Sequence, residues 1–523
     1  MLVYLFDGIS DSLTQSESAF DSNIVRGSET DSNGEYSFTQ LRNGSYTVKA
    51  KKNGIFTVAS PVVVNGGNPA PVLLEPTIAA LPSTLYAPWN TSLQMINVVE
   101  LSNNGNSDIS VNFTMRDFQG NPVKSAGLVV PSNSKYDLII SSLVEQNQYG
   151  TVQFTTSGPN TESFRCDMVN YRPARVGSGK MFEYVFSIPC QVANYGATSS
   201  LTNRLFPGDG TGLRRISNWL TLANLSGDPH VFTVRSYAAN GDLLNVSYIS
   251  LDALARFDAN MAAFADVTLF TVSPDDATIP YMSLLGRYDD GDSNSRVMAF
   301  SSYAQEGTSG TRCVPVANVG SAESYTEMGN PGESTNTVFE TLYNADGTLA
   351  ESTTLSLPPH GVRHTSFARH LPIGTSGTLC LRTDAPDSLV FNELTYYFVG
   401  RRVLETGFLT PPNELTGVAT MFGAKNYFFN SFNWLRLMNL SDSTSNVEVT
   451  TDPNEANEVV SSYTIAAHAR LDVPLHSLPF KVIVNDYGRF QTNSSQIAAT
   501  VVRVIPNGTS VSATSAILTT SVR

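Results

Sequence analysis

The chain of 523 residues is too long for one hydrophobic core, so its length predicts several domains. Only 15% of the residues are charged and 41% are hydrophobic, while Ser, Thr, Asn and Gly are abundant, a balance typical of extracellular all-β proteins. The net charge of −14 argues against nucleic acid as a partner, because a phosphate backbone needs a basic surface. No window holds the ~18 apolar residues that a membrane-spanning helix requires.

The first predicted elements lie in residues 27–50, GSETDSNGEYSFTQLRNGSYTVKA. Tyr36 and Phe38 alternate with polar residues, and so do Tyr46 and Val48, which predicts two half-buried strands. Two Asn-Gly pairs in the same segment supply the positive-φ positions that turns between such strands need. The segment therefore predicts a small β module at the N-terminus.

This segment also resembles a known domain family. Its pattern T-D-x-x-G-x-Y-x-F-x-x-L-x-x-G-x-Y-x-V is formed by Thr30, Asp31, Gly34, Tyr36, Phe38, Leu41, Gly44, Tyr46 and Val48. It resembles the carboxypeptidase-regulatory-like (transthyretin-like) module, which is similar to the B-type repeats of bacterial surface proteins. The resemblance covers residues 1–76 and implies a β-sandwich that serves as a stalk or spacer.

The family pattern normally has another strand before the segment equivalent to residues 3–6, and this chain begins almost at that second strand. We therefore expect a processed or truncated fragment of a longer protein, with a strand supplied by a neighbouring chain as the alternative. The first residues, MLVYLFDGISDS, also lack the basic and apolar regions of a signal peptide. Together with the composition, this predicts an extracellular or cell-surface protein whose secretion signal lies outside this chain.

Beyond a linker at residues 77–87, four segments align on an asparagine. These asparagines are Asn103, Asn224, Asn330 and Asn439, at intervals of 121, 106 and 109 residues. In two of the segments, NWLTLANLS and NWLRLMNLS, seven of nine letters agree. Repeats of about 100 residues have the size of an immunoglobulin-like sandwich. The alignment therefore predicts a repeated building block instead of a site used twice.

A second landmark supports the alignment. An X-Gly turn, ending at Gly120, Gly241 and Gly347, begins sixteen residues after the first three asparagines, whereas the fourth copy has Ala456 at the glycine position. Alternating strands precede and follow each turn. Asn330-Pro331 and the YNADG motif at 343–347 resemble secreted bacterial β-sandwich repeats that read V-N-P-S-x-x-x-A-x-V-x-x-x-x-Y-x-A-D-G.

The predicted fold is all-β, a tandem array of immunoglobulin-like and transthyretin-like β-sandwich domains. The predicted domains are a carboxypeptidase-regulatory-like sandwich lacking its first strand at 1–76 and immunoglobulin-like sandwiches at 80–175, 176–306, 307–400 and 401–523. Such an array predicts a rod of five sandwiches.

Three tryptophans are candidate ligand-facing aromatics: Trp89, Trp219 and Trp434. In the two paired segments, Trp lies on the strand face opposite the alternating leucines, where an exposed ring can bind a sugar. The aligned positions in the other copies hold Val98 and Tyr325. This variation favours packing against neighbouring strands over ligand binding.

One loop is rich in the hard oxygen ligands that calcium prefers. Its candidate ligands are Asp289, Asp290, Asp292 and Asn294. The loop lacks the spacing of an EF-hand, so a solvated β-turn is the alternative interpretation. Apart from this candidate calcium site, the sequence predicts no cofactor.

No catalytic constellation is apparent in the sequence, which lacks H-E-x-x-H, P-loop and G-x-S-x-G motifs. His360, His364 and His370 share parity on a predicted strand, but a metal site would need a further ligand. The other copies lack this trio, which favours solvated histidines. We therefore expect that the protein is not an enzyme.

The chain has four cysteines, none of them in a C-x-x-C pair, which excludes common zinc knuckles. Two disulfides or four free thiols are both compatible with the spacing. The proposed pairs are Cys166–Cys190, joining consecutive domains, and Cys313–Cys380, crossing one sandwich. Disulfides fit an extracellular protein.

These features predict a non-enzymatic extracellular structural protein: a stalk, surface fibre or filament subunit. Its expected partners are other copies of itself or cell-surface components. The first alternative is an adhesin or carbohydrate-binding protein that uses exposed aromatics, including Tyr396 and Tyr397, to bind glycans. The second is a non-catalytic accessory region of a larger secreted enzyme.

Overall fold

The computed structural model describes residues 2–7, 24–29, 44–52, 55–56, 60–64, 84–157, 163–176, 178, 181–202, 216–261, 267–289, 299–308, 310–319, 322–366, 370–385, 388–399, 403–410, 419–423, 432–451, 459–475, 487–492, 496–506 and 514–521. Antiparallel strands dominate these residues, beside two 3₁₀ turns, η1 (Ser92–Gln94) and η2 (Ile140–Ser142). Among them, no helix has the length and apolar character needed to cross a membrane. The chain is all-β, as the composition and the alternating patterns predicted.

The chain divides into two compact units, the first of which comprises Met1–Leu81 with Asp276–Ile279. Its strands are β1 (Leu2–Asp7), β2 (Ile24–Glu29), β3 (Gly44–Lys52), β4 (Ile55–Phe56) and β5 (Ser60–Val64). They form one antiparallel sheet in the order β2-β1-β3-β4, in which β5 also pairs with β3. Of the two predicted strands, the one with Tyr46 lies in β3, and the one with Tyr36 falls outside the described residues.

The second unit, Pro82–Asp275 with Pro280–Arg523, contains four sandwiches that we name the first to fourth repeats. The first repeat comprises β6 (Thr84–Asn90), β7 (Ile96–Asn103), β8 (Ile109–Asp117), β9 (Pro122–Val130), β10 (Ser134–Ile139), β11 (Tyr149–Ser157), β12 (Phe164–Pro173) and β13 (Phe182–Pro189). The second comprises β14 (Thr198–Leu201), β15 (Ile216–Asn224), β16 (His230–Ala238), β17 (Leu243–Leu251), β18 (Arg256–Asn260), β19 (Val267–Pro274), β20 (Tyr281–Asp289) and β21 (Ala299–Tyr303).

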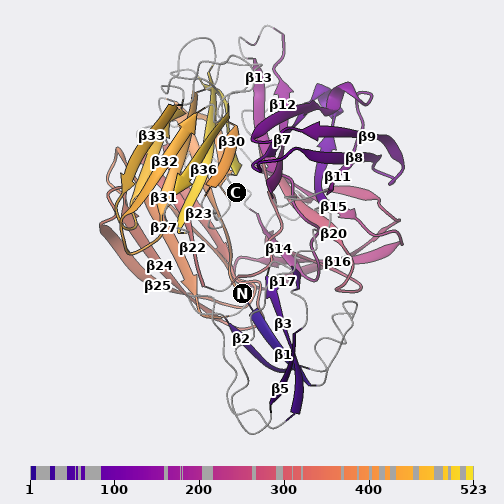
Figure 1. Cartoon of the computed structure of the whole chain (residues 1–523), viewed down its shortest axis with the longest axis horizontal. Helices are drawn as coiled ribbons and strands as arrows, with labels where there is room; N and C mark the ends of the chain where they lie inside the picture. Colours follow the sequence, from indigo (N-terminus) through magenta and orange to yellow (C-terminus); the bar gives the residue numbers. More distant parts are fainter. Residues whose placement is uncertain are drawn as a thin grey trace. The chain divides into compact units, whose positions relative to one another are not determined.

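The third repeat comprises β22 (Gly310–Val319), β23 (Ala322–Gly329), β24 (Asn336–Asn344), β25 (Leu349–Leu357), β26 (Val362–Ser366), β27 (Thr375–Thr383), β28 (Val390–Val399) and β29 (Val403–Thr410). The fourth comprises β30 (Ala419–Gly423), β31 (Phe432–Asn439), β32 (Ser445–Thr451), β33 (Val459–Ile465), β34 (Arg470–Pro474), β35 (Tyr487–Thr492), β36 (Ile497–Pro506) and β37 (Thr514–Ser521). Figure 1 labels several of these strands, among them β22 to β25 and β30 to β33.

All four repeats share one topology. When the eight strands of a repeat are numbered in chain order, one sheet has the order 5-2-7-8 and the other 1-6-3-4. In the third repeat, pairing between β22 and β23 joins the two sheets into one of eight strands. This shared strand order is direct structural support for the repeat alignment.

Two strands lie in different repeats from those assigned by the predicted domain boundaries. The limits at 175 and 400 placed residues 182–189 and 403–410 at the start of a new domain. In the structure these residues form β13 and β29, which pair with β12 and β28 as the eighth strands of the first and third repeats. Alternation identifies a strand but not the sheet that it joins, so the boundary was placed too early.

The alternating patterns place one face of each strand in a core. In β8, the side chains of Ile109, Val111, Phe113 and Met115 are buried, and they belong to the same core as Phe154 of the neighbouring strand β11. Side chains of successive residues point to opposite faces of a sheet, so alternate positions line the core. The same rule buries the leucines of the two nearly identical segments.

Two disulfides link neighbouring strands of single repeats. Cys166 on β12 is joined to Cys190, which directly follows β13, and Cys313 on β22 is joined to Cys380, its register partner on β27. The first bond therefore lies inside the first repeat and does not connect consecutive domains. The second connects adjacent strands and does not cross a sandwich.

Candidate functional site: the joints between repeats

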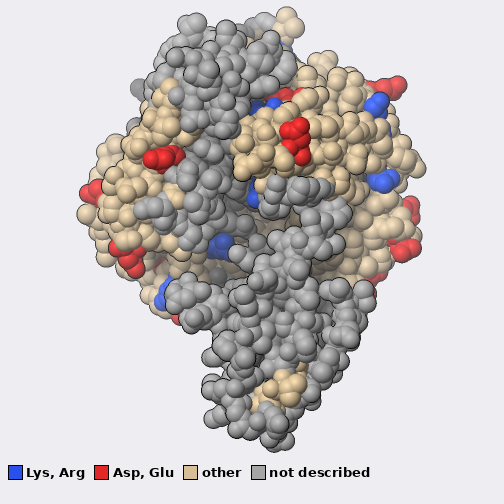
Figure 2. All heavy atoms as spheres, in the orientation of Figure 1, with Lys and Arg blue, Asp and Glu red and all other residues tan. Residues whose placement is uncertain are grey.

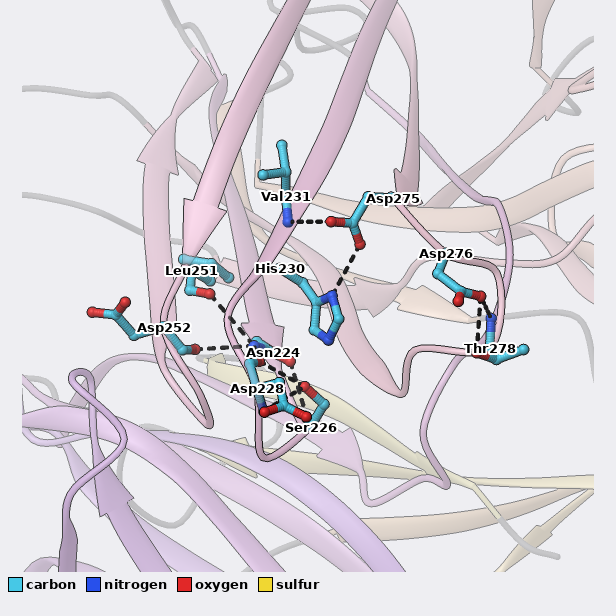
Figure 3. Close-up of polar contacts among 10 residues, drawn as sticks. All are labelled: Asn224, Ser226, Asp228, His230, Val231, Leu251, Asp252, Asp275, Asp276 and Thr278. Atoms are coloured by element: carbon cyan, nitrogen blue, oxygen red, sulfur yellow. Dashed lines mark hydrogen bonds and ion pairs between the residues drawn. The ribbon is translucent and has the colours of Figure 1, made fainter. Parts of the chain in front are cut away.

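Each repeat is organised around the asparagine on which the sequence aligns. Asn224 ends β15 and is completely buried. Its Nδ2 group donates hydrogen bonds to the carbonyl oxygens of Asp228 at 2.7 Å, Asp252 at 3.0 Å and Leu251 at 3.5 Å (Figure 3). Its Oδ1 atom accepts a hydrogen bond from the Ser226 N–H at 3.0 Å. One side chain thus connects two separate turns of the repeat.

The same connection occurs in the other three repeats. The asparagines at this position, Asn103, Asn330 and Asn439, are all completely buried. The corresponding carbonyl acceptors are Ser107, Val130 and Pro131, then Ser334, Leu357 and Pro358, and finally Ser443, Ile465 and Ala466. Because a buried carbonyl without a partner is costly, the asparagine is a structural requirement of each repeat. We call it the register asparagine.

The second of these turns has a left-handed residue in every repeat. Asn133, Leu254, His360 and His468 have φ angles of 47°, 62°, 56° and 57°. Non-glycine residues seldom adopt this conformation, so its recurrence at one aligned position indicates a specific role. We call this segment the acceptor turn.

The acceptor turn of one repeat receives the hairpin of the repeat before it. The hairpin glycines Gly120, Gly241 and Gly347 have φ angles of 90°, 93° and 89°. A Cβ atom on Gly241 would lie 2.0 Å from the Pro359 carbonyl oxygen, and one on Gly347 would lie 2.0 Å from that of Ala467. The glycines are therefore needed for close contact between repeats as well as for the turn. We call each such contact a joint.

A backbone hydrogen bond crosses all three of these joints. The N–H groups of Arg256, Val362 and Arg470 donate to the carbonyl oxygens of Phe118, Ala239 and Ala345, at 2.8, 2.8 and 2.9 Å. The donors directly follow the acceptor turns, and the acceptors lie in the hairpins. The joints from first to second, second to third and third to fourth repeat thus share one geometry.

Aromatic stacking supports two of the joints. The ring of Tyr237 stacks on His360 with centroids 4.1 Å apart, and the ring of Tyr343 stacks on His468 at 4.3 Å. The Nε2 atom of His360 also lies 3.2 Å from a carboxylate oxygen of Glu333. Each histidine is thus fixed between its own repeat and the preceding one.

A buried arginine fills the joint between the first and second repeats. The Nη1 atom of Arg256 donates to the carbonyl oxygens of Trp89 at 3.0 Å and Gly150 at 2.5 Å. The carboxylate of Asp258 accepts two further hydrogen bonds from the same guanidinium, at 3.0 and 2.8 Å. The charge of the arginine is therefore balanced inside the second repeat while its tip enters the first.

Arg470 repeats this arrangement between the third and fourth repeats. Its Nη1 atom donates to the carbonyl oxygens of Val316 at 2.9 Å and Gly377 at 3.4 Å. Asp472 accepts two hydrogen bonds from the guanidinium, at 2.9 and 2.7 Å. Burial alone would raise the pKa of Asp472, but the positive charge of Arg470 outweighs burial and lowers it.

A different ion pair connects the second and third repeats. Arg287 on β20 and Glu327 on β23 form two hydrogen bonds, of 2.8 and 2.6 Å, with both side chains almost fully buried. The guanidinium also donates to the carbonyl oxygen of Leu201. Burial alone would raise the pKa of Glu327, but the positive charge of Arg287 outweighs burial and lowers it. The carboxylate is therefore kept ionised.

The corresponding ion pair joins the fourth repeat to the first. Arg503 on β36 donates to both carboxylate oxygens of Glu100 on β7, at 2.5 and 2.6 Å. Lys135 lies 3.2 Å from the same carboxylate and 3.1 Å from Asp137. Burial alone would raise the pKa of Glu100, but the charges of Arg503 and Lys135 lower it to about 2.

This last pair changes the predicted shape of the repeat array. The described contacts run from each repeat to the next and then from the fourth repeat back to the first. The four repeats therefore do not form a single extended row, contrary to the expected rod. The pattern of one sequence cannot reveal this, because the pair joins positions 403 residues apart.

The candidate aromatics occupy three different environments. Trp89 is completely buried, and its Nε1–H donates to the carbonyl oxygens of Thr151 at 3.0 Å and Arg116 at 3.2 Å. It is a core residue of the first repeat, and its complete burial leaves no face for a ligand. It lies on β6 and not at the position aligned with the other two tryptophans. Trp434 packs against Val502 and Val504. Trp219 remains 38% exposed.

The tyrosine and histidine candidates do not form a shared site. Tyr396 is buried, and burial raises its pKa. His360 belongs to an acceptor turn, His364 lies 3.9 Å from Glu327, and His370 pairs with a separate glutamate. Shared parity was misleading because His360 precedes β26, which begins at Val362.

The candidate calcium loop lies almost wholly outside the described residues. Asp289 is the last residue of β20, while Asp290, Asp292 and Asn294 are not described. Among the described residues, no group of three or more His, Cys, Asp or Glu side chains is arranged to hold a metal ion. The calcium site stays a prediction.

Sequence reasoning missed the charged residues of the joints. A signal for them was present, since Glu100 and Glu327 both lie three residues before a register asparagine. In the structure, Arg287 and Arg503 are the strand partners of Asn218 and Asn433, each of which lies six residues before a register asparagine. Extending the alignment from the asparagines would have shown that Glu100 and Glu327 occupy equivalent positions, but not which arginine each of them contacts.

Comparisons with known proteins give no identification. No protein-family model and no curated protein matches the chain. A crystal structure titled Thermotoga maritima 1070 is 18% identical, covers 20% of this chain and 91% of its own, and has a TM-score of 0.16. A tetra-tandem repeat from the extending region of a large adhesion protein is 13% identical, covers 83% of this chain and 97% of its own, and has a TM-score of 0.09. At these TM-scores neither structure bears on function.

Proposed function

We propose that the protein is a non-enzymatic extracellular structural subunit, part of a stalk, surface fibre or filament. The observation that carries this proposal is the repetition of one buried joint at three successive junctions. Each of these joints combines a close hairpin contact with a backbone hydrogen bond. A chain that fixes the relative positions of its domains in this way is suited to bearing load or holding a spacing.

The cysteines support an extracellular location. Each disulfide lies within one repeat, and such bonds persist in oxidising compartments. On the face shown in Figure 2, the described basic and acidic side chains are scattered among uncharged ones. Such a surface suits protein or glycan partners better than nucleic acid.

The sequence resemblances agree with this proposal. The N-terminal module resembles the carboxypeptidase-regulatory-like family, whose members serve as stalks or spacers, and its described strands form a β-sheet. The repeats resemble secreted bacterial β-sandwiches. The partners that we propose are other copies of the protein or components of a cell surface. Apart from the candidate calcium loop, we propose no cofactor.

The ionised groups with shifted pKa values also support a structural role. Glu100, Glu327 and Asp472 are each held ionised by an arginine, although burial alone would raise their pKa values. A carboxylate whose negative charge is stabilised by a bound arginine stays ionised at neutral pH and is poorly suited to acid–base chemistry. These carboxylates serve as interface residues in our proposal.

The proposal is tested by locating the protein on intact source cells. Antibodies against the purified chain should label the cell exterior or attached fibres in immunogold electron microscopy, without permeabilisation. An antibody against a cytosolic protein should give no label under the same conditions. Label that appears only after permeabilisation, together with free cysteine thiols in the native protein, would refute the proposal.

Trp219 supports a second candidate function, that of a glycan-binding adhesin. Its ring is 38% exposed on β15, and exposed aromatic rings are suited to stacking on sugars. A glycan array should then show binding that Trp219→Ala abolishes and Trp434→Ala leaves intact. Equal binding by the wild type and Trp219→Ala would remove Trp219 as the site.

A further inference from the structure

The joints of the four repeats are of two alternating kinds. Arg256 and Arg470 reach backbone carbonyls of the preceding repeat at the first-to-second and third-to-fourth joints. Ion pairs with glutamate are found instead at the second-to-third joint and between the fourth and first repeats. The four repeats thus consist of two similar halves, residues 84–303 and 310–521.

The two halves meet through equivalent residues. Glu100 in the first half and Glu327 in the second each lie three positions before a register asparagine. Arg287 and Arg503 are the register partners of Asn218 and Asn433. Each of these two residues lies six positions before a register asparagine. The two nearly identical segments, around Trp219 and Trp434, are accordingly the same strand of the second repeat in each half.

Each half therefore offers one glutamate and one arginine to the other half. The first half gives Glu100 and Arg287, and the second gives Glu327 and Arg503. An interface in which two similar bodies contribute the same pair of groups in opposite directions is the kind found in two-fold symmetric dimers. Either half presents a surface that fits its counterpart from another copy of the chain.

The connection between the halves is a single short segment between β21 and β22. Its Gln305 bridges them, since its side chain donates to the Asn392 carboxamide oxygen at 2.8 Å and its backbone pairs with Ser199. Neither disulfide links the halves, because each lies within one repeat. The halves can therefore move apart, while still joined by this segment, without reduction of a disulfide.

The joint that closes the fourth repeat onto the first lacks one component of the others. The hairpin glycine position is occupied by Ala456 in the fourth repeat. At the equivalent Gly241, a Cβ atom would lie 2.0 Å from the Pro359 carbonyl oxygen of the acceptor turn. The sequence of the fourth repeat thus lacks the glycine that this contact uses in the other repeats, and the buried Glu100–Arg503 pair joins the fourth repeat to the first.

We propose that two copies of the chain exchange halves, so that the first half of one copy binds the second half of another through the same two ion pairs. Reciprocal exchange gives a dimer, and open-ended exchange gives a filament. This inference rests on the proposed structural function and names its partner, a second copy. Exchange is favoured over an open monomer, because an open monomer leaves both ion pairs unmade.

The test uses two full-length variants with opposite charges. Variant X carries Arg287→Glu and Arg503→Glu, and variant Y carries Glu100→Arg and Glu327→Arg. Within each variant, both inter-half ion pairs become contacts between like charges, which oppose closure within one chain and pairing between identical chains. A mixture restores opposite charges at both ion-pair positions between the halves of X and Y.

X and Y are unfolded together with their disulfides intact, refolded, and measured by size-exclusion chromatography with light scattering. We expect a 1:1 complex with at least twice the mass of one chain in the mixture, and single-chain mass for each variant alone. The chain carrying all four substitutions restores both pairs internally and serves as the control for folding. A mixture that stays at single-chain mass, while X, Y and the control have β-sheet circular dichroism, would refute exchange.

If X or Y fails to fold, the single variants Glu100→Arg and Arg503→Glu provide the same test with the second-to-third ion pair kept. Their mixture again restores every inter-half charge pair, and single-chain mass again counts against exchange. Exchange is measured on purified protein, whereas the structural function is tested by surface labelling of cells. A negative mixture with positive labelling therefore refutes only the exchange.

Discussion

Arg503 and Glu100 lie 403 residues apart in the sequence and form two hydrogen bonds to each other, with both side chains buried. The pair brings the last repeat onto the first and is balanced further by Lys135. Removing one member of such a pair leaves an uncompensated charge in the interior, which costs about 3–5 kcal/mol. The closed arrangement of the repeats therefore depends on this contact.

The stability of the protein should fall in acid because of this pair. The pKa of Glu100 is about 2 in the folded protein, below its ordinary value of 4.5. A depressed pKa stabilises the fold above about pH 4.5, and this contribution is lost as the pH falls toward 2. Glu327 contributes in the same direction, whereas Asp137, whose pKa is raised by burial, opposes it.

Urea unfolding at pH 7, 5 and 3 measures this dependence, with Glu100→Gln as the comparison. The free energy of unfolding of the wild type should decrease more steeply between pH 5 and 3 than that of the variant. Equal slopes for the two proteins would show that Glu100 does not titrate with a depressed pKa.

Asn224→Ala should destabilise the second repeat. The substitution removes the Nδ2 group that donates hydrogen bonds to the carbonyl oxygens of Asp228 and Asp252, so these acceptors lose that donor. The expected loss is about 1–3 kcal/mol for each such buried group. Asn240→Ala, in the exposed hairpin turn, is the control and should change the free energy of unfolding by less than about 1 kcal/mol. Similar values for both would contradict the structural role.

Gly241→Ala, compared with Gly374→Ala, distinguishes the cost of disturbing the joint from the cost of a strained turn. Gly374 has a similar φ, 88° against 93°, but a Cβ atom on Gly374 would have no described atom within 4 Å, whereas one on Gly241 would meet the Pro359 carbonyl. Gly374→Ala should cost about 1 kcal/mol for the strained backbone. Gly241→Ala should cost about 2 kcal/mol more, because the hairpin must move. Equal costs in thermal unfolding would mean that the hairpin does not dock.

The two disulfides should differ in their contribution to stability. Cys166 and Cys190 enclose a separation of 24 residues, and Cys313 and Cys380 one of 67. In the chain-entropy account, the larger loop stabilises more, by about 1 kcal/mol. Replacing each pair by serine and measuring denaturant unfolding checks this order. A larger loss for the shorter loop would show that strand packing dominates.

Local sequence features predicted much of the fold. Alternation revealed the strands, and the register asparagine revealed the repeats, because both depend on neighbouring residues. The glycine of the X-Gly turn was recognised as a turn residue, but its second role at Gly241 depends on Pro359, which is far away in sequence. The sequence pattern of a single repeat contains no information on that contact.

The residues of the joints were harder to predict for the same reason. Arg287 and Glu327 act as a pair only because two repeats meet, and each alone has the pattern of an ordinary charged residue on a strand. Trp89 was a candidate for ligand binding, and only the packing inside the first repeat shows that it is a core residue. Long-range contacts, within a repeat for Trp89 and between repeats for the ion pairs, decide these roles.

A double-mutant cycle between Glu100 and Arg503 tests the central claim most directly. Urea unfolding of the wild type, Glu100→Gln, Arg503→Gln and the double variant gives the coupling energy of the pair. The exposed pair Arg382 and Asp384 is the control and should give less than about 1 kcal/mol. A coupling of at least about 2 kcal/mol is expected for the buried pair, and a coupling near zero would contradict the closure of the fourth repeat onto the first.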